Sequence, residues 1–118
     1  MTMTLTRIST HVLDTARGVP AKDLPVRLES QEPPGPWRLV ATARTDDDGR
    51  CHQLLPDGET LAPGIYRLSF DTASYYTAQK VQGLYPVVQI TFAIRDGETH
   101  FHIPLLLSPY AYTTYRGS

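Results

Sequence analysis

Apolar and polar residues alternate along most of this chain, which is the pattern of β-strands that are buried on one face. Segments rich in Gly, Pro and Asp separate the alternating stretches and predict turns and loops. The stretches predicted as strands are residues 7–14, 24–30, 37–45, 50–55, 65–71, 88–95, 99–107 and 110–115. Seven or eight short strands at this close spacing predict an all-β fold, a sandwich of two antiparallel sheets.

One segment has a helical pattern instead. Asp71 and Thr72 offer an N-terminal cap for a helix, and Gly83 offers a stop at its C-terminal end. We therefore expect one short helix, from Ala73 to Gln82.

The predicted strand at 99–107 combines an apolar face with a face that carries chemistry. Its core face has four large apolar side chains, whereas His100, His102, Pro104 and Leu106 point the other way. Pro104 cannot donate to a sheet ladder, so we expect it where its missing N–H is unneeded, such as a sheet edge or a bulge. A short return strand and the tail Arg116-Gly117-Ser118 follow. Such a polar tail is usually frayed, but its place beside the histidine strand makes a working role worth considering.

Composition and charge narrow the class of protein. The 118 residues predict a single domain spanning residues 1–118. The formal net charge of −1 gives no case for nucleic acid or an anionic membrane surface, and no apolar run approaches the ~20 residues of a membrane span. The single cysteine, Cys51, predicts a small buried thiol and no internal disulfide. Residues 1–5 lack the pattern of a secretory signal, so we expect a cytoplasmic protein.

Histidines are the first candidates for chemistry, because imidazole takes and gives protons near neutral pH. Of the four histidines, His11 and His102 both point away from the core side of their predicted strands. Leu13, Pro104 and Leu106 share those faces, and this mixture fits a pocket, a subunit interface with chemistry, or a plain dimer face.

Arg50 follows the Asp46–Gly49 turn and stays charged, so it can grip a carbonyl or an oxyanion, although a solvated strand-end charge is the commoner role. Two mechanisms remain open on this evidence. His11, His100 and His102 could ligate zinc with a water in the fourth position, or two histidines and Arg50 could act on a ring carbonyl without metal. Spacing does not choose between them.

Three stretches together resemble the 5-hydroxyisourate hydrolase family, the transthyretin-like proteins of urate breakdown. They are STHVLDT with GVPA (residues 9–15 and 18–21), TDDDGR (residues 45–50), and residues 100–118, whose ending YRGS is similar to the family's signature C-terminus. The similarity extends over nearly the whole chain. It implies a transthyretin-type sandwich that forms a homotetramer, a dimer of dimers, with active sites in the channel where dimers meet.

The resemblance also implies an activity and a set of residues. The activity is hydrolysis of the lactam ring of 5-hydroxyisourate to 2-oxo-4-hydroxy-4-carboxy-5-ureidoimidazoline, with no cofactor. The family's functional positions fall on His11, Arg50, His102 and Ser118. The resemblance implies that the two histidines activate water and shuttle protons, that Arg50 holds the substrate and the oxyanion, and that Ser118 hydrogen-bonds near the reacting centre. Tyr115 and Arg116 would shape the pocket and fix the tail.

The chain departs from the family pattern at two positions. Asp46 stands where the family often has Asn, which places a carboxylate close to Arg50, and Phe101 stands where it often has Tyr. The alternative of a thyroid-hormone carrier, like vertebrate transthyretin, would share the sandwich and the LLSPY run. The carrier lacks counterparts of His11, Arg50, His102 and the YRGS ending. The identity of the general base and the roles of His52 and His100 stay open.

Overall fold

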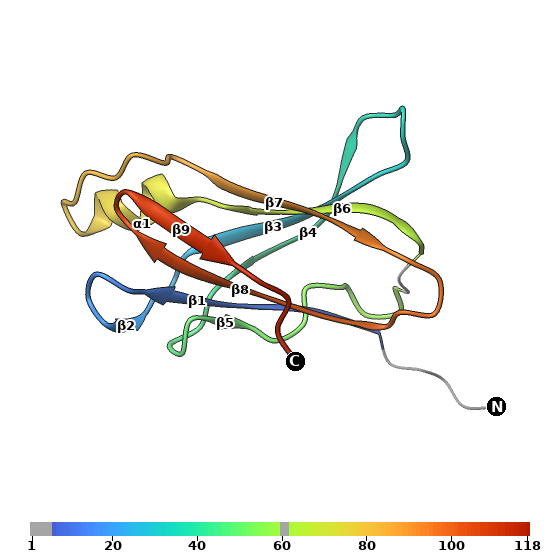
Figure 1. Ribbon diagram of the computed structural model, residues 1–118, viewed down its shortest axis with the longest axis horizontal. Helices are drawn as coiled ribbons and strands as arrows, with labels where there is room; N and C mark the ends of the chain where they lie inside the picture. The colour runs from blue at the N-terminus through green and yellow to red at the C-terminus, as the bar shows by residue number, and fades with distance from the viewer. Residues whose placement is uncertain (1–5, 60–61) are drawn as a thin grey trace.

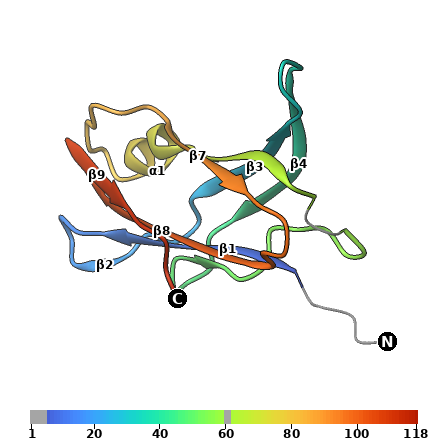
Figure 2. The same cartoon turned by 45° about the vertical axis from the view of Figure 1, so that its right-hand side comes forward.

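The computed structural model describes residues 6–59 and 62–118, which form two packed β-sheets with one helix at one end (Figures 1 and 2). Residues 1–5, on which the expectation of no secretory signal rests, lie outside this range. The elements are β1 (Arg7–Asp14), β2 (Val19–Pro20), β3 (Pro25–Gln31), β4 (Trp37–Arg44), β5 (Arg50–Cys51), β6 (Gly64–Phe70), α1 (Thr72–Ala78), β7 (Val88–Ile94), β8 (His100–Ser108) and β9 (Ala111–Thr114). The predicted sandwich with a short helix is confirmed.

The first sheet has five strands in the order β2-β1-β8-β9, with β5 also paired to β1. β1 and β8 run parallel, so the expectation that both sheets are antiparallel is wrong for this pair. The reason lies in the topology, because β3, β4, β6 and β7 leave to build the second sheet before the chain returns beside β1. Alternation within one strand carries no information about the direction of its partner.

Pro104 is on β8, which lies between β1 and β9, so it is inside the sheet and not at its edge. The Pro104 carbonyl accepts a 2.8 Å hydrogen bond from Thr114 Oγ1 on the β9 side. The ladder between β8 and β9 starts at the next residue, where Leu105 pairs with Thr114. Because N–H and C=O of a strand residue point the same way, the missing N–H of Pro104 falls in the gap between this ladder and the bridge that pairs His102 with Gly117.

The second sheet has the order β4-β3-β6-β7 and is antiparallel throughout. Between the sheets lies one core, to which the alternating residues of β1, β3, β6 and β8 contribute their large apolar side chains. Phe70, Leu28, Leu68 and Leu105 are completely buried in it. Each such side chain stabilises the fold by ~1.5–3 kcal/mol relative to exposure. The polar faces of β1 and β8 therefore point out of the sandwich.

Three element boundaries differ from the sequence-based expectations. β2 lies in a segment predicted as a loop, and β5 keeps two of its six predicted residues because Leu54 and Leu55 turn into the core. The helix is capped by Asp71, whose Oδ1 accepts from the Ser74 N–H at 3.0 Å, but it ends well before Gln82. Lys80 adopts a left-handed conformation with φ of 58°, which stops the helix ahead of Gly83.

Two further expectations concern Cys51 and membranes. Cys51 is free and buried, and burial raises the pKa of its thiol to about 11, as expected of an inert thiol.

No helix within residues 6–59 and 62–118 combines the length and the hydropathy that crossing a membrane requires.

Candidate functional site

The outer face of the five-stranded sheet gathers the polar residues of three strands. On β1, Ser9 and His11 face outward, and the parallel register places Ser9 beside His102 on β8. On the other side of β1, His11 is the partner of Arg50 on β5. Three of the predicted catalytic residues therefore meet on neighbouring strands, although they are distant in sequence.

A surface depression of about 280 Å³ lies over this junction. It is lined by Arg7, Ser9, Thr10, Arg50, Cys51, His52, His100, His102 and Ser118. The predicted residues Arg50, His102 and Ser118 are thus brought together, and His11 adjoins them through its pairing with Arg50. His52 and His100, whose roles were open, also line the depression.

Arg50 is positioned by the turn that precedes β5. The carboxylate Oδ1 of Asp46 accepts hydrogen bonds from the main-chain N–H groups of Asp48 and Arg50, each at 2.9 Å. These bonds, that of Arg50 foremost, hold the pKa of the Asp46 carboxyl below its ordinary value. Gly49 then docks on β1, where its carbonyl accepts from the Val12 N–H at 2.7 Å, and any Cβ at Gly49 would collide with the Val12 carbonyl.

The carboxylate of Asp46 therefore binds the main chain of the turn, and it is not hydrogen-bonded to the guanidinium of Arg50 in the described residues. Its second oxygen lies 3.4 Å from His52 Nε2. The Arg50 side chain itself is half-buried. Asp46 at this position thus builds the turn through main-chain bonds that an Asn side-chain oxygen could equally accept.

His102 is half-buried, and its ring has a defined orientation. Ser9 Oγ lies 2.8 Å from His102 Nδ1. Partial burial lowers the pKa of His102 below its ordinary value, and the positive charge of Arg50 adds to this, with smaller contributions from His11 and His100. The imidazole of His102 is therefore neutral at physiological pH.

The C-terminal tail returns to the histidine strand after β9, and both views show it crossing β8 towards β5 (Figures 1 and 2). The Gly117 N–H donates a 2.7 Å hydrogen bond to the His102 carbonyl. The Arg116 guanidinium contacts Glu98 Oε2 at 2.9 Å and the His100 carbonyl at 3.2 Å, and it lies 4.6 Å from the centroid of the Phe101 ring. The tail is anchored rather than frayed, and Ser118 reaches the depression.

The five residues predicted to line a substrate pocket lie around the depression rather than in its lining. Leu13 and Leu106 are register partners on the same outer face, both half-buried, and Pro104 lies beside His11. Tyr115 is 57% exposed. Arg116 points to Glu98 and Phe101, so in this chain it holds the tail.

Sequence reasoning missed Ser9. It lies two residues before His11 on the same strand, so alternation places its side chain on the histidine face. Its relation to His102 needed the β1–β8 register, which the sequence does not reveal.

The three-histidine zinc set is not assembled in the part of the chain that the structure describes, where no group of three or more His, Cys, Asp or Glu side chains has the geometry to hold a metal ion. The register explains this, because His11 is aligned with Pro104 and not with His100 or His102.

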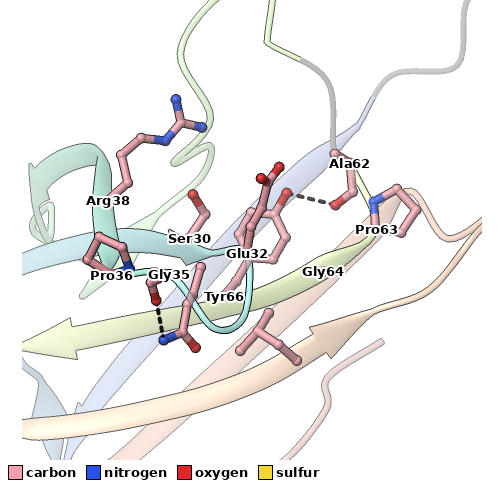
Figure 3. Close-up of a pocket in the computed structure, with 11 residues that line it drawn as sticks. Ser30, Glu32, Gly35, Pro36, Arg38, Ala62, Pro63, Gly64 and Tyr66 are labelled. Atoms are coloured by element: carbon pink, nitrogen blue, oxygen red, sulfur yellow. Dashed lines mark hydrogen bonds between the residues drawn. The ribbon is translucent and has the colours of Figure 1, made fainter.

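A larger cavity of about 480 Å³ lies on the other sheet, between the β3–β4 loop and the start of β6 (Figure 3). Two of its polar side chains bond within the chain, since Tyr66 OH donates to the Ala62 carbonyl at 2.8 Å and Gln31 Nε2 to the Gly35 carbonyl at 2.9 Å. Among the described residues that line it there is no histidine. The smaller depression is the better candidate because proton-transfer groups converge there.

Comparison with known proteins shows which family this chain is similar to. The profile of the HIUase/Transthyretin family matches residues 8–117. The 5-hydroxyisourate hydrolase of Mus musculus is 46% identical over 112 residues, which cover 94% of each chain. The 5-hydroxyisourate hydrolase of Pseudomonas aeruginosa is 43% identical over 119 residues, which cover 95% of this chain and 91% of that one.

Solved structures give the same fold. The structure of Klebsiella pneumoniae 5-hydroxyisourate hydrolase has a TM-score of 0.84 and 32% identity, covering 97% of this chain and 100% of that one. Sea bream transthyretin in complex with thyroxine has a TM-score of 0.86 and 31% identity, covering 94% of both chains. The backbone alone does not separate a hydrolase from a thyroxine-binding protein. Because the profile spans residues 8–117 and the relatives match over almost their whole length, the chain belongs to the HIUase/Transthyretin family.

Proposed function

We propose that this protein is an enzyme that hydrolyses the lactam ring of 5-hydroxyisourate to 2-oxo-4-hydroxy-4-carboxy-5-ureidoimidazoline in urate catabolism. The observation that carries the proposal is the convergence of Arg50, His102 and Ser118 in one depression, with His11 adjoining. Relatives called 5-hydroxyisourate hydrolase at 46% and 43% identity support the same substrate.

Hydrolysis of a cyclic amide needs three things: a deprotonated water, a stabilised oxyanion and a proton for the leaving nitrogen. His11 and His102 bring two imidazoles to the reacting centre, where a proton is taken from water and given to the leaving nitrogen. The guanidinium of Arg50 donates parallel hydrogen bonds to the ring carbonyl, where negative charge develops in the transition state. Ser118 adds a hydroxyl at the rim of the site. No step in this scheme needs a metal or a cofactor.

The proposed assembly is a homotetramer, a dimer of dimers whose active sites lie where the dimers meet. Its support is the character of the outer sheet face. The depression is open in a single chain, and beside it the paired Leu13 and Leu106 form an apolar surface that a second subunit can cover. Closure by a partner would exclude water from the site and strengthen the electrostatic contacts of Arg50.

A small-molecule carrier is the second candidate, because sea bream transthyretin in complex with thyroxine has the same fold. The enzyme is favoured by the chemistry of the outer face. A basic side chain and several imidazoles form a poor lining for a largely apolar ligand, whereas they suit a polar heterocycle with several carbonyl groups.

The test is direct. 5-Hydroxyisourate is generated from urate by urate oxidase, and its ultraviolet absorbance is followed with and without the protein. We expect decay much faster than the spontaneous reaction, unaffected by a chelator. Decay at the spontaneous rate would exclude the hydrolase, and loss of activity with the chelator would favour the zinc alternative.

The site assignment has its own variants. His102→Asn, Arg50→Ala and deletion of Ser118 should each lower turnover and leave the fold intact, as checked by circular dichroism. Full activity in all three would show that the reaction takes place elsewhere on the chain.

A further inference from the structure

We propose that Ser9 is a positioning residue that holds His102 in the tautomer with its proton on Nε2, so that His102 donates to the substrate carbonyl and His11 is the general base. The role of the histidines towards substrate rests on the proposed function. The tautomer itself rests on the contacts of Ser9 and can be measured without substrate.

The hydroxyl hydrogen of Ser9 needs a hydrogen-bond acceptor. Ser9 is 7% exposed, and within residues 6–59 and 62–118 the one hydrogen-bond partner of its hydroxyl is His102 Nδ1, at 2.8 Å. A buried hydroxyl that lacks an acceptor for its hydrogen is unfavourable. An unprotonated Nδ1 provides that acceptor, whereas a protonated Nδ1 would leave the Ser9 hydrogen without an acceptor in the described part of the chain. The pair is therefore satisfied with Ser9 as the donor.

The C-terminal tail covers the side of the imidazole ring opposite Nδ1. Nδ1 and Cδ2 are the two atoms bonded to Cγ, and Gly117 packs against Cδ2 so closely that a Cβ there would lie 2.5 Å from it. Ser9 thus holds one side of the ring, and the tail covers the other. A ring flip would lose the Ser9 bond, so the orientation is fixed, and Nε2 lies at the outer end of the ring.

The tautomer of His102 determines which histidine can act as the general base. A neutral imidazole protonated on Nε2 has no lone pair on that nitrogen, so it donates a hydrogen bond and cannot remove a proton from water there. His11 faces the same side of the sheet, two residues from Ser9 and therefore about 7 Å along the strand. It is free to act as the base.

The reaction then balances. His11 takes a proton from water as the water oxygen bonds to the lactam carbon. Arg50 and the Nε2–H of His102 stabilise the oxyanion. The carbon–nitrogen bond breaks, and the imidazolium of His11 returns the proton to the leaving nitrogen. The carboxylic acid that forms ionises to the solvent.

Nitrogen NMR tests the tautomer in the wild-type protein, labelled with 15N in histidine, at neutral pH. We expect the Nδ1 resonance of His102 at the position of an unprotonated nitrogen and the Nε2 resonance at that of a protonated one. Comparison with His102→Gln assigns the signals. A protonated Nδ1 would overturn the proposal.

Two variants test the consequence for catalysis. Ser9→Ala should lower kcat about tenfold, the effect of an orienting hydrogen bond, with KM nearly unchanged. Its His102 spectrum should show both tautomers. Ser9→Thr keeps the hydroxyl on a β-branched side chain suited to a strand, and it should restore both kcat and the single tautomer. Ser108→Ala is the matched control, because Ser108 Oγ bonds to the Ala111 carbonyl in the β8–β9 turn.

The outcomes separate the two proposals. Wild-type kcat and an unchanged His102 spectrum in Ser9→Ala would overturn the role of Ser9, and so would a Ser9→Thr variant as slow as Ser9→Ala. A wild-type protein without activity on 5-hydroxyisourate would overturn the proposed function and the substrate roles of both histidines. The wild-type NMR spectrum would still decide the tautomer in that case.

Discussion

The main chain of Gly117 is hydrogen-bonded to the main chain of His102, with the Gly117 N–H donating to the His102 carbonyl at 2.7 Å. The same glycine lies against the imidazole ring, so the C-terminal tail and the central histidine form one unit. The tail therefore limits how the ring can move, and it ends with Ser118 at the depression.

Replacing Gly117 with Ala should lower activity about tenfold or more, because the new Cβ would lie 2.5 Å from His102 Cδ2 and must displace either the ring or the tail. The melting temperature should change little, since the tail lies outside the core. Steady-state kinetics and thermal unfolding measure the two effects.

Gly97→Ala provides the control for Gly117→Ala. Gly97 is in the turn before β8 with φ of 82°, and a Cβ there would meet nothing within 4 Å. Its substitution should cost about 1 kcal/mol of stability through backbone strain and leave activity unchanged. Equal activity of Gly117→Ala and the wild type would show that the tail does not position the ring.

Arg50→Lys should reduce kcat by roughly 10²-fold despite keeping the charge, because an ammonium cannot reproduce the two parallel hydrogen bonds of a guanidinium at the oxyanion. The half-buried position of Arg50 beside His11 makes this geometry matter. Arg44→Lys is the control, since Arg44 lies on β4 of the other sheet, has a side chain that is 62% exposed and pairs with Asp23. Wild-type kcat in Arg50→Lys would mean that only charge is needed.

Much of this site follows from local patterns in the sequence. The alternation correctly predicted that His11 and His102 point away from the core. The Asp46–Gly49 turn correctly predicted that Arg50 lies at the start of a strand. These features depend on residues that are near one another in the chain. Local patterns also correctly predicted the sandwich and the position of the helix start.

The features that local patterns missed depend on distant segments. Ser9 and His102 are 93 positions apart, and their contact depends on a parallel pairing that alternation does not encode. The return of Gly117 to His102 likewise depends on where β9 ends. The early end of α1 came from Lys80 taking a left-handed conformation in place of a glycine, which residue propensities disfavour.

The free energy of unfolding should depend on pH in part through the protonation of His102. Its pKa is lowered in the folded protein, so as pH falls the unfolded chain binds a proton before the folded one does. The contribution of His102 to the free energy of unfolding is therefore complete above the ordinary histidine pKa of about 6.5 and is lost as pH falls through the lowered folded value. Urea unfolding between neutral pH and the acid range measures it, and His102→Gln should flatten the slope.

Arg50→Ala provides an independent check on the cause of that shift. Removing the positive charge should raise the pKa of His102 towards its ordinary value, because Arg50 is one of the groups that lower it. Proton NMR titration of the His102 ring reports the value directly. A pKa of His102 that stays the same in Arg50→Ala would exclude Arg50 as a cause and leave burial, with the neighbouring His11 and His100, to account for the shift.

Leu106→Glu should break the proposed tetramer into dimers. Leu106 is half-buried on the outer sheet face and pairs with Leu13, so a carboxylate there would have to be desolvated at a subunit interface, at a cost of several kcal/mol per ion. Light scattering coupled to size-exclusion chromatography gives the mass, and activity should fall with it because the depression loses its cover. Leu39→Glu is the matched control, since Leu39 is 58% exposed on β4 of the other sheet and should leave both mass and activity unchanged. A Leu106→Glu protein with the wild-type mass would place the interface elsewhere, and a dissociated protein with full activity would show that one open sheet face is enough for catalysis.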